Sequence, residues 1–384
     1  MYTVVLVRYG EIAVKSSRVR RRMEEALLDS IRFKLKSEGL TDFKFKRERG
    51  RIFVITNEAE RVASILTRVF GIVSTSPAIE IDNSIEEIIK YSLFLAETNI
   101  KNRIKFAVRA RRVKSYELTS KDVERRVGEA ILKRFPRLKV DLENPDYMLY
   151  VEVREKRAYI FDKILKGVGG LPYGVEGKVV ALISGGVDSV VASWLMMKRG
   201  CDVIPVHCDM GEYYGPEAKD RAMRVVRWLR EWVPKEDFKV YWVPLGEAHK
   251  ALGNLRNRYR CLVCKSLMYK IAELICSAEN CKAIVTGESI GQVASQTLDN
   301  LNYLTRTVTT PVIRPVVGLD KEEIIDIGRR LSVFKIAGKD VGKCKLVPKY
   351  PITHVTMRDV EYLSELNLDR IARAVFQRAK LLKM

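Results

Sequence analysis

The segment Ser184-Gly185-Gly186-Val187-Asp188-Ser189 decides how the carboxyl-terminal half of this chain folds. An apolar run at residues 179–183 precedes it and a helix-forming stretch at residues 190–197 follows. This pattern predicts a strand, a glycine turn and a helix. Glycines permit a tight turn in which backbone N–H groups converge, and a helix N-terminus adds partial positive charge. We therefore expect Ser184, Gly185, Gly186 and Ser189 to hold a phosphate group.

An acidic residue stands where a Walker loop would carry lysine, because Val187-Asp188-Ser189 follows the second glycine. A carboxylate beside phosphates acts most readily through Mg²⁺, so Asp188 is expected to orient that ion. The hexapeptide resembles the SGGxDS signature of the PP-loop ATP pyrophosphatases, which cleave ATP between its α and β phosphates and adenylate a substrate. The alternative is an ordinary Gly-Gly turn between a strand and a helix.

Length and composition set the class of protein. With 384 residues, the chain is expected to form two or three domains, and 47% apolar residues suffice for packed cores. The sequence contains no uncharged apolar run of the roughly 18 residues that span a membrane. The first residues pass directly into a strand pattern, without a signal peptide. We therefore expect a cytosolic protein.

The net charge of +21 predicts a polyanionic partner. Residues 101–114 hold seven Lys or Arg and no acid, whereas an ordinary solvated face usually mixes both signs. Ile104, Phe106, Val108 and Ala110 alternate with cations, so the two groups should occupy opposite faces of a strand. The residues that we expect to contact the phosphates of a nucleic acid are Lys101, Arg103, Lys105, Arg109, Arg111 and Arg112.

Two small α+β modules are expected before the hexapeptide. The first, residues 1–71, has strands at 3–8, 43–47 and 51–56 and helices at 18–36 and 58–69, with a hairpin turn at Arg49-Gly50. This order is typical of a ferredoxin-like unit. The second, residues 72–165, has helices at 84–99 and 120–135 and strands at 103–111, 147–154 and 157–164.

The third module, residues 172–384, follows a glycine-rich linker and is expected to be an α/β domain with a doubly wound parallel sheet. Strands at 179–183, 203–207, 239–244 and 283–286 alternate with helices at 219–232 and 264–277, and a last helix is expected at 369–383. Ligands of such folds bind at the carboxyl ends of the strands.

Three amino-terminal segments extend the resemblance. Phe106-Ala107-Val108-Arg109-Ala110-Arg111-Arg112 and Asn144-Pro145-Asp146-Tyr147 resemble a THUMP domain, an RNA-binding module of tRNA-modifying enzymes. Arg8-Tyr9-Gly10-Glu11-Ile12 with Lys15 resembles the ferredoxin-like domain that precedes THUMP in the ThiI-type tRNA 4-thiouridine synthetases, or tRNA sulfurtransferases. Over essentially the whole chain, this resemblance implies ATP-dependent adenylation of uridine 8 in tRNA and replacement of its O4 by sulfur. The resemblance also implies a role in thiamine-related sulfur chemistry.

The resemblance also implies the nucleotide site. Segments 286–289 and 291–297 match the TGE and GQVxSQT segments of the family. The positions that it assigns to ATP, beyond the hexapeptide, are Leu182, Ile183, His207, Cys208, Lys265, Gly287 and Gln296. Lys321 matches a lysine near the reacting phosphates, where a cation would stabilise the leaving pyrophosphate. The alternatives are a structural histidine at 207, a polar helix start at 291–297 and a capped surface helix at Lys321.

Three cysteines are candidates for the sulfur chemistry. Cys344 lies between Lys343 and Lys345, which should lower its pKa and favour a thiolate, and it matches the family's catalytic cysteine. Cys261 and Cys264 begin a helix as a C-x-x-C pair that could take a metal such as zinc, form a disulfide, or do neither. With Cys344 as third ligand, an iron–sulfur cluster such as [4Fe-4S] is expected, as in archaeal-type members that the chain resembles.

Many bacterial members carry a rhodanese domain, for which this sequence leaves no room after the last expected helix. Sulfur is therefore expected from a separate carrier protein, from sulfide or through the cluster. A homodimer is among the assemblies that we consider. Two other functions remain open, a synthetase or amidotransferase acting on a small molecule and a non-catalytic RNA-binding protein.

Overall fold

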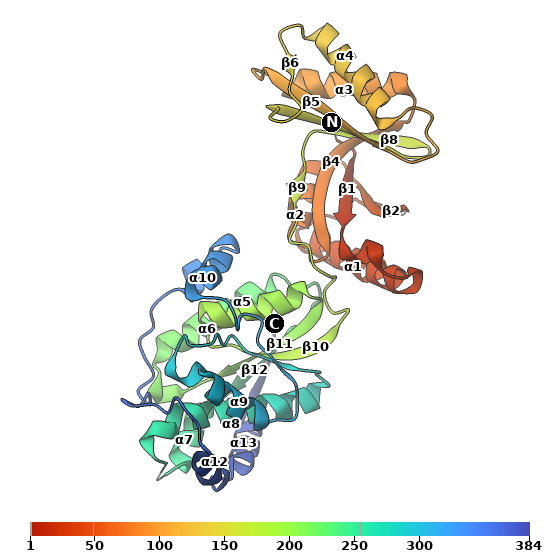
Figure 1. Ribbon diagram of the computed structural model, residues 1–384. Coiled ribbons are helices and arrows are strands. Elements are labelled where there is room, and N and C mark those ends of the chain that lie inside the picture. The colour runs from red at the N-terminus through yellow and green to blue at the C-terminus, as the bar shows by residue number, and fades with distance from the viewer. Residues whose placement is uncertain (1, 49, 254) are drawn as a thin grey trace. The chain divides into compact units, whose positions relative to one another are not determined.

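The computed structural model describes residues 2–48, 50–253 and 255–384. The chain forms two compact units, Met1–Gly170 and Leu171–Met384 (Figure 1). Arg49, where the first hairpin turn was predicted, lies outside the described residues. Among the helices of the described part, none is both long and apolar enough to cross a membrane.

The amino-terminal unit is built on one nine-stranded sheet with the order β2-β3-β1-β4-β8-β7-β5-β6, and β9 pairs with β4. Its strands are β1 (Val4–Tyr9), β2 (Lys44–Glu48), β3 (Arg51–Ile55), β4 (Ile72–Asp82), β5 (Lys105–Arg112), β6 (Lys139–Val140), β7 (Tyr147–Val153), β8 (Arg157–Phe161) and β9 (Leu165–Lys166). Its α-helices are α1 (Ser17–Ser37), α2 (Ala59–Leu66), α3 (Ile85–Asn99) and α4 (Ser120–Arg134). The elements expected from the sequence are present, and their bounds shift by a few residues at most.

The long strand β4 was missed by the sequence analysis, although it lies at the centre of this sheet. It is antiparallel to β1 on one side and to β8 on the other. Its middle reads Ser-Thr-Ser-Pro at residues 74–77, a polar run without alternation. Thr75 is nevertheless fully buried and donates a hydrogen bond to the Ala63 carbonyl at 2.8 Å. The amino-terminal modules therefore share one continuous sheet.

The exposed basic side chains predicted for β5 are observed, but the predicted apolar face is correct only in part. Lys105, Arg109 and Arg111 are exposed, whereas Phe106 and its alternating neighbours are buried. Ile104, predicted to share the buried face, is 56% exposed, because the strand begins one residue after it.

The second unit contains a six-stranded sheet with the order β14-β13-β10-β11-β12-β15. Its strands are β10 (Gly177–Leu182), β11 (Cys201–Cys208), β12 (Lys239–Val243), β13 (Ile284–Val285), β14 (Val312–Ile313) and β15 (Lys380–Lys383). Its α-helices are α5 (Val187–Lys198), α6 (Pro216–Arg230), α7 (Ala248–Ala251), α8 (Arg260–Glu279), α9 (Leu298–Arg306), α10 (Lys321–Arg330), α11 (Phe334–Ala337), α12 (Met357–Ser364) and α13 (Leu368–Phe376).

The first five strands of that order are parallel, which agrees with the α/β class expected from the sequence. Helix α5, with α6 and α10 near it, covers one face of the sheet, and α8 with α9 and α13 covers the other (Figure 1). Because helices cover both faces of the sheet, side chains on both sides of β10 and β11 are buried. This explains why their sequences are mostly apolar without alternation.

The expected final helix is wrong beyond Phe376. Helix α13 ends there, and β15 then pairs antiparallel with β12. Met384 exchanges backbone hydrogen bonds with Phe238 at 3.0 and 3.3 Å. Pairing with an open sheet edge satisfies the backbone of this segment, so tertiary contact prevails over its helical propensity.

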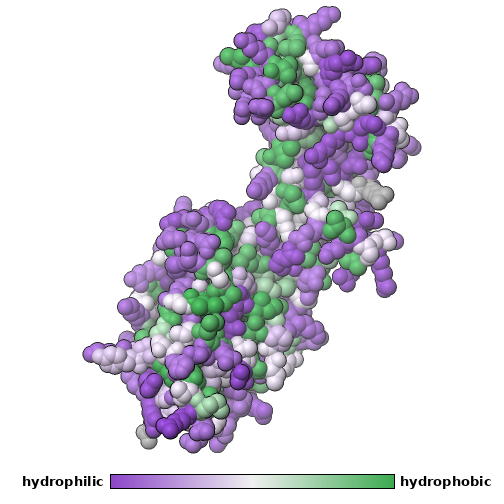
Figure 2. All heavy atoms as spheres, in the orientation of Figure 1, coloured by the Kyte–Doolittle hydropathy of each residue, from purple (hydrophilic) through white to green (hydrophobic). Residues whose placement is uncertain are grey.

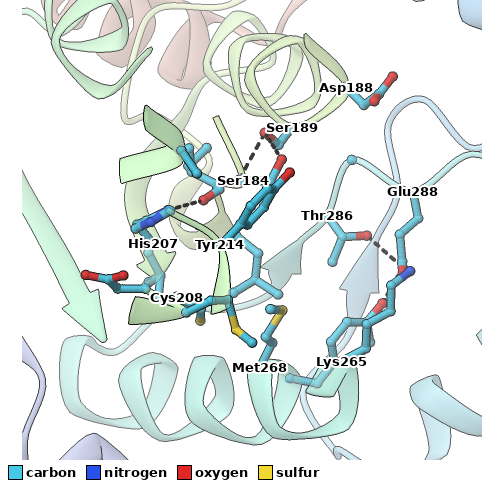
Figure 3. A pocket seen from close by; sticks show the side chains of 18 of the residues that line it. Ser184, Asp188, Ser189, His207, Cys208, Tyr214, Lys265, Met268, Thr286 and Glu288 are labelled. Carbon is cyan, nitrogen blue, oxygen red and sulfur yellow. Dashed lines mark hydrogen bonds and ion pairs between the residues drawn. The ribbon is translucent and has the colours of Figure 1, made fainter. Parts of the chain in front are cut away.

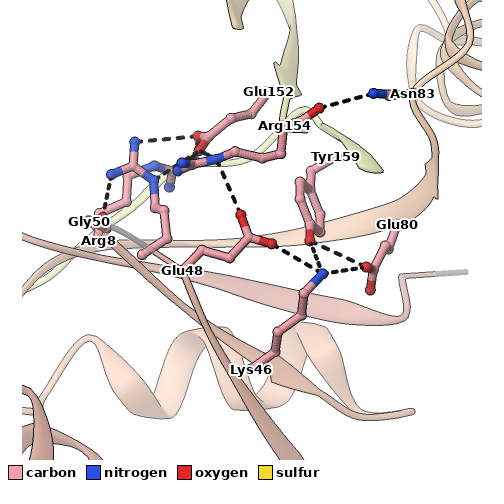
Figure 4. Close-up of polar contacts among 10 residues, drawn as sticks. Arg8, Lys46, Glu48, Gly50, Glu80, Asn83, Glu152, Arg154 and Tyr159 are labelled. Carbon is pink, nitrogen blue, oxygen red and sulfur yellow. Dashed lines mark hydrogen bonds and ion pairs between the residues drawn. The ribbon is translucent and has the colours of Figure 1, made fainter. Parts of the chain in front are cut away.

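A buried ionic cluster holds the two halves of the amino-terminal sheet together (Figure 4). Glu152 on β7 has a side chain only 6% exposed, and Arg51 on β3 and Arg154 donate to it at 3.0 and 2.7 Å. Arg8 on β1 lies 3.9 Å from the same carboxylate. Burial raises the pKa of Glu152, but the three guanidinium groups outweigh burial and hold it below its usual value.

We predict that Glu152→Ala lowers the free energy of unfolding of this unit by about 3–5 kcal/mol, because it leaves buried arginines without their shared carboxylate. Chemical denaturation of the full chain measures the change. Glu155→Ala, at an exposed position of the same hairpin, is the matched control and should change it by less than about 0.5 kcal/mol. Equal losses in both variants would contradict the role given to the cluster.

The contribution of Glu152 to the free energy of unfolding should depend on pH. Because the folded protein holds the pKa of Glu152 below the usual glutamate value, its stabilisation is present above about pH 4.3 and is lost as pH falls through the lower, folded-state pKa. The stability difference between the wild type and Glu152→Gln should therefore shrink under acid.

Candidate active site

A cavity opens at the carboxyl edge of the sheet in the second unit (Figure 3). It is formed where β10, β11 and β13 end, which is where ligands of doubly wound folds bind. Ten of the residues predicted to bind nucleotide line it: Leu182, Ile183, Ser184, Asp188, Ser189, His207, Cys208, Lys265, Gly287 and Gln296. Gly185 and Gly186 shape the turn beside it without lining it.

The turn after β10 is closed by its two serines. Ser189 Oγ donates to the Gly186 carbonyl at 3.0 Å and accepts from the Ser184 amide at 3.2 Å. Gly185 has a φ of +81°, and a Cβ there would lie 2.9 Å from the Ala222 nitrogen, so glycine is required on both counts. The turn therefore holds the N-terminus of α5 against the cavity, as an anion site needs.

Gly287, which the resemblance assigns to ATP, lines the cavity and also lies in tight contact with α5. A Cβ at this position would lie 2.5 Å from the Ser189 nitrogen and 2.6 Å from the Asp188 carbonyl carbon. The segment after β13 is thus in backbone contact with the hexapeptide.

Asp188 is paired with Lys321, although the two residues are far apart in the sequence. Lys321 Nζ lies 2.9 and 2.8 Å from the two carboxylate oxygens, and Gln292 Nε2 donates to one of them at 3.3 Å. Lys321 opens α10, which Asp320 caps through a capping box. Lys321 therefore both begins a capped helix and lies beside Asp188, so the two interpretations of this residue are compatible.

His207 ends β11 as a buried, neutral side chain. Burial lowers its pKa, and its Nδ1 lies 2.8 Å from the Ile183 carbonyl, to which it donates. The ring packs on Trp242, with centroids 4.3 Å apart. The bond fixes the tautomer, so Nε2 is left as an acceptor.

Other cavity residues were not predicted. Sequence reasoning gave no role to Asp209, Met210, Tyr214, Lys219, Met268, Tyr269, Thr286 and Glu288, all of which line the cavity. Two of them had a usable signal, Asp209 directly after β11 and Glu288 in the matched segment after β13, because acids that follow buried strands of an α/β sheet lie at the ligand edge. In the described part of the chain, Gln296 Oε1 is buried without a hydrogen-bond partner. It is an acceptor that a bound ligand could satisfy.

Comparison with known proteins identifies the family. Residues 174–368 match the family described as thiamine biosynthesis protein (ThiI), residues 4–76 match the ThiI ferredoxin-like domain, and residues 82–162 match the THUMP domain. A probable tRNA sulfurtransferase of Methanosarcina acetivorans is 37% identical, over 99% of this chain and 94% of its own length. The chain belongs to the ThiI family.

Other ThiI relatives agree. A probable tRNA sulfurtransferase of Thermococcus kodakarensis is 40% identical over 92% of this chain and 93% of its own length. Among solved structures, a 4-thiouridine synthetase–RNA complex with bound ATP matches with a TM-score of 0.88 and 32% identity, over the whole of both chains. The family expected from the motifs is confirmed.

The three cysteines expected to serve this ThiI protein lie in one region outside the cavity lining. Cys261 and Cys264 are in the first turn of α8, and both are within electrostatic range of Cys344. Burial raises the pKa of Cys261 and of Cys264. Across the described residues, no three His, Cys, Asp or Glu side chains are arranged to hold a metal ion.

The cations predicted to bind RNA are not equivalent. Hydrophilic side chains cover most of the visible surface of the amino-terminal unit (Figure 2). Arg112 donates to the carbonyls of Val113, Lys114 and Tyr116, so it holds a loop. Lys105 is paired with Asp141 at 2.9 Å. The other four positions are exposed, and of these Arg109 donates to the Leu142 carbonyl at 2.8 Å: Lys101, Arg103, Arg109 and Arg111.

We predict that Gly287→Ala lowers the free energy of unfolding by about 1–3 kcal/mol, because its methyl group would overlap the backbone of Asp188 and Ser189. Thermal and urea denaturation report the change. Gly318→Ala is the matched control, since a Cβ at that position meets nothing within 4 Å. Identical stabilities of the two variants would refute the tight contact.

Proposed function

We propose that this ThiI protein is a cytosolic, ATP-dependent tRNA sulfurtransferase that converts a uridine of tRNA, uridine 8 by family resemblance, into 4-thiouridine. The observation that carries the proposal is the cavity, which combines the hexapeptide with Lys265 and Gln296 at the carboxyl edge of the sheet. Support comes from the similarity to a 4-thiouridine synthetase solved with RNA and ATP.

In this proposal the cavity binds ATP. The turn with Ser184, Gly185, Gly186 and Ser189 holds the pyrophosphate, and Lys265 and Gln296 contact the nucleotide. The remaining nucleotide contacts proposed are Leu182, Ile183, His207, Cys208 and Gly287. Asp188 is the residue that would hold Mg²⁺. Its Oδ2 accepts from Lys321 and Gln292, but its Oδ1 accepts from Lys321 and has a second lone pair for the ion, and Mg²⁺ is usually bound by one or two carboxylates plus phosphate oxygens and waters. Bound Mg²⁺ would neutralise phosphate charge.

The chemistry then proceeds in two displacements. Uridine O4 attacks the α-phosphorus of ATP while the bond to the bridging α–β oxygen breaks, and the uridine N3 proton is lost. Lys321, 2.8 Å from Asp188, stabilises negative charge on the departing pyrophosphate. A sulfur nucleophile next attacks C4, and AMP leaves with O4 because adenylation has turned that oxygen into a good leaving group.

Cys344 is the proposed sulfur-side residue. Cys261, Cys264 and Cys344 supply thiol donors of the kind that iron–sulfur clusters use, and they lie within electrostatic range of one another. Among the described residues the three thiols are not arranged as a metal site, so to hold a [4Fe-4S]-type cluster they would have to draw together and lose their protons, since burial keeps the first two as thiols. The sulfur donor is sulfide, which attacks C4 directly, or the persulfide of a carrier protein. In the second case a thiolate such as that of Cys344 then attacks the carrier's sulfur, the S–S bond breaks to release 4-thiouridine, and a disulfide remains.

The amino-terminal unit binds tRNA in this scheme. Structured RNA is recognised mainly through phosphates and shape, and the exposed cations at residues 101, 103, 109 and 111 suit that role. Arg109 would first release the Leu142 carbonyl, and Lys105 and Arg112 join these proposed contacts once their own partners are released.

We predict that Asp188→Asn reduces 4-thiouridine formation by at least about a hundredfold, because the residue would lose its charge toward both Mg²⁺ and Lys321. A strain lacking the gene is complemented with each variant, and 4-thiouridine in its tRNA is quantified by mass spectrometry.

Asp326→Asn, an exposed carboxylate that pairs with Arg329 on the helix of Lys321, is the control and should restore 4-thiouridine fully. Unchanged 4-thiouridine in the strain without the gene would end the proposal. Full complementation by Asp188→Asn would exclude the role given to that carboxylate.

The sulfur side is tested by the ultraviolet–visible spectrum of protein purified without oxygen. We expect a broad charge-transfer band from the cluster in the wild type and its loss in Cys261→Ala. Cys276→Ala, a buried cysteine near the opposite end of α8, should keep the band. A colourless wild type that forms 4-thiouridine would refute the cluster while leaving Cys344 as the sulfur-side residue.

A further inference from the structure

One wall of the cavity is a buried ionic network centred on Glu288 (Figure 3). Its carboxylate is 7% exposed and accepts hydrogen bonds from Lys265 Nζ at 2.9 Å and from Thr286 Oγ1 at 3.0 Å. Arg314 Nε donates to it at 3.0 Å, and the Tyr269 hydroxyl also donates to it. One carboxylate therefore receives donors from α8, from its own loop and from the segment after β14.

Arg314 belongs to a layer behind Glu288. Its Nη2 donates to the Tyr269 hydroxyl at 3.0 Å and to Thr305 Oγ1 at 2.9 Å, so its guanidinium is held by α8 and α9. Lys265, Tyr269 and Glu288 line the cavity, and among the described lining residues Arg314 is absent. It can therefore influence a ligand only through Glu288 and Tyr269.

The charges of this network do not cancel. Lys265 and Arg314 carry two positive charges against the single carboxylate, which leaves one net positive charge at the cavity wall. Burial raises the pKa of Glu288, but Lys265, Tyr269 and Arg314 outweigh it, so the carboxylate is ionised at neutral pH. An ammonium group has three donors, and the bond to Glu288 uses one, so two can face a ligand.

We propose that Glu288 and Arg314 are positioning residues that fix the ammonium group of Lys265 in the orientation in which it binds ATP. This inference rests on the proposed function. Glu288 holds Lys265 directly, and Arg314 holds Glu288. Without the carboxylate, two cations would face each other inside a buried site, and the lysine would turn away from the position at which its free donors meet the nucleotide.

The other end of α8 offers a matched control. Glu279 accepts from Lys239 Nζ and from the Tyr241 hydroxyl, both at 2.8 Å, and its side chain is 8% exposed. Glu279 thus has one lysine and one tyrosine as partners, as Glu288 does, and its side chain is about as buried. Unlike Glu288, it does not line the cavity. A purely structural effect of losing a buried glutamate should appear equally at both positions.

The test measures ATP binding to the full chain by titration calorimetry, with thermal melting of each variant. Loss of a charge-assisted hydrogen bond predicts that Glu288→Gln weakens ATP binding by about tenfold or more. Glu288→Asp, which keeps the charge, should recover part of the loss. Arg314→Lys should shift binding in the same direction by a smaller factor, and it serves as the second variant if Glu288→Gln is unstable. Glu279→Gln should bind ATP within about twofold of the wild type.

Turnover supplies a second readout. The KM for ATP should rise in Glu288→Gln while the KM for tRNA stays unchanged. If Glu288→Gln and Arg314→Lys bind ATP as the wild type does, or if Glu279→Gln weakens binding equally, the positioning role is wrong and the proposed function stands. If the wild type itself binds no ATP, both proposals fall.

Discussion

The parallel register of β10 between β11 and β13 is the constraint on which the rest of the second unit depends. Leu182 pairs with Val206, and Ala181 pairs with Val285, so the three strands end at the same edge of the sheet. Because each strand leads directly into a loop there, the hexapeptide, His207 and Glu288 converge without any long excursion of the chain. The contact of Gly287 with the backbone of Asp188 and Ser189 then locks two of these loops together.

Buried carboxylates organise cations in both units. Glu152 gathers three arginines across the amino-terminal sheet, and Glu288 gathers a lysine and an arginine at the cavity. In each case the partners come from separate elements, so the ion pairs specify how those elements are arranged. Such clusters add little net stability compared with apolar packing, but removing the carboxylate is costly because it strands buried charge. In this way the buried carboxylates fix the positions of some of the many basic side chains.

Much of the architecture was accessible from local patterns. Apolar runs bounded by glycine or polar residues predicted β10, β11 and β12, the helical spacing of Met23, Leu27 and Ile31 predicted α1, and the alternation of strands and helices predicted α8. Local patterns predicted the wrong element, or none, where tertiary contacts outweighed local propensity. Strand β4 carries serine, threonine and proline inside a sheet, because the Thr75 hydroxyl finds the Ala63 carbonyl. The segment at Lys380–Lys383 forms a strand because β12 presents an open edge.

The sequence by itself determined the family, the order of the modules and the motifs that line the cavity, because these depend on residue types at short, fixed spacings. Only the tertiary structure decided which distant side chains meet. Lys321 reaches Asp188 across 133 positions, and Arg314 reaches Glu288 across 26. Such pairings depend on strand register and helix packing, which sum over many weak contacts, and no short motif records them. For the same reason, the structure alone showed that Gly287 contacts a helix backbone and that Arg112 holds a loop.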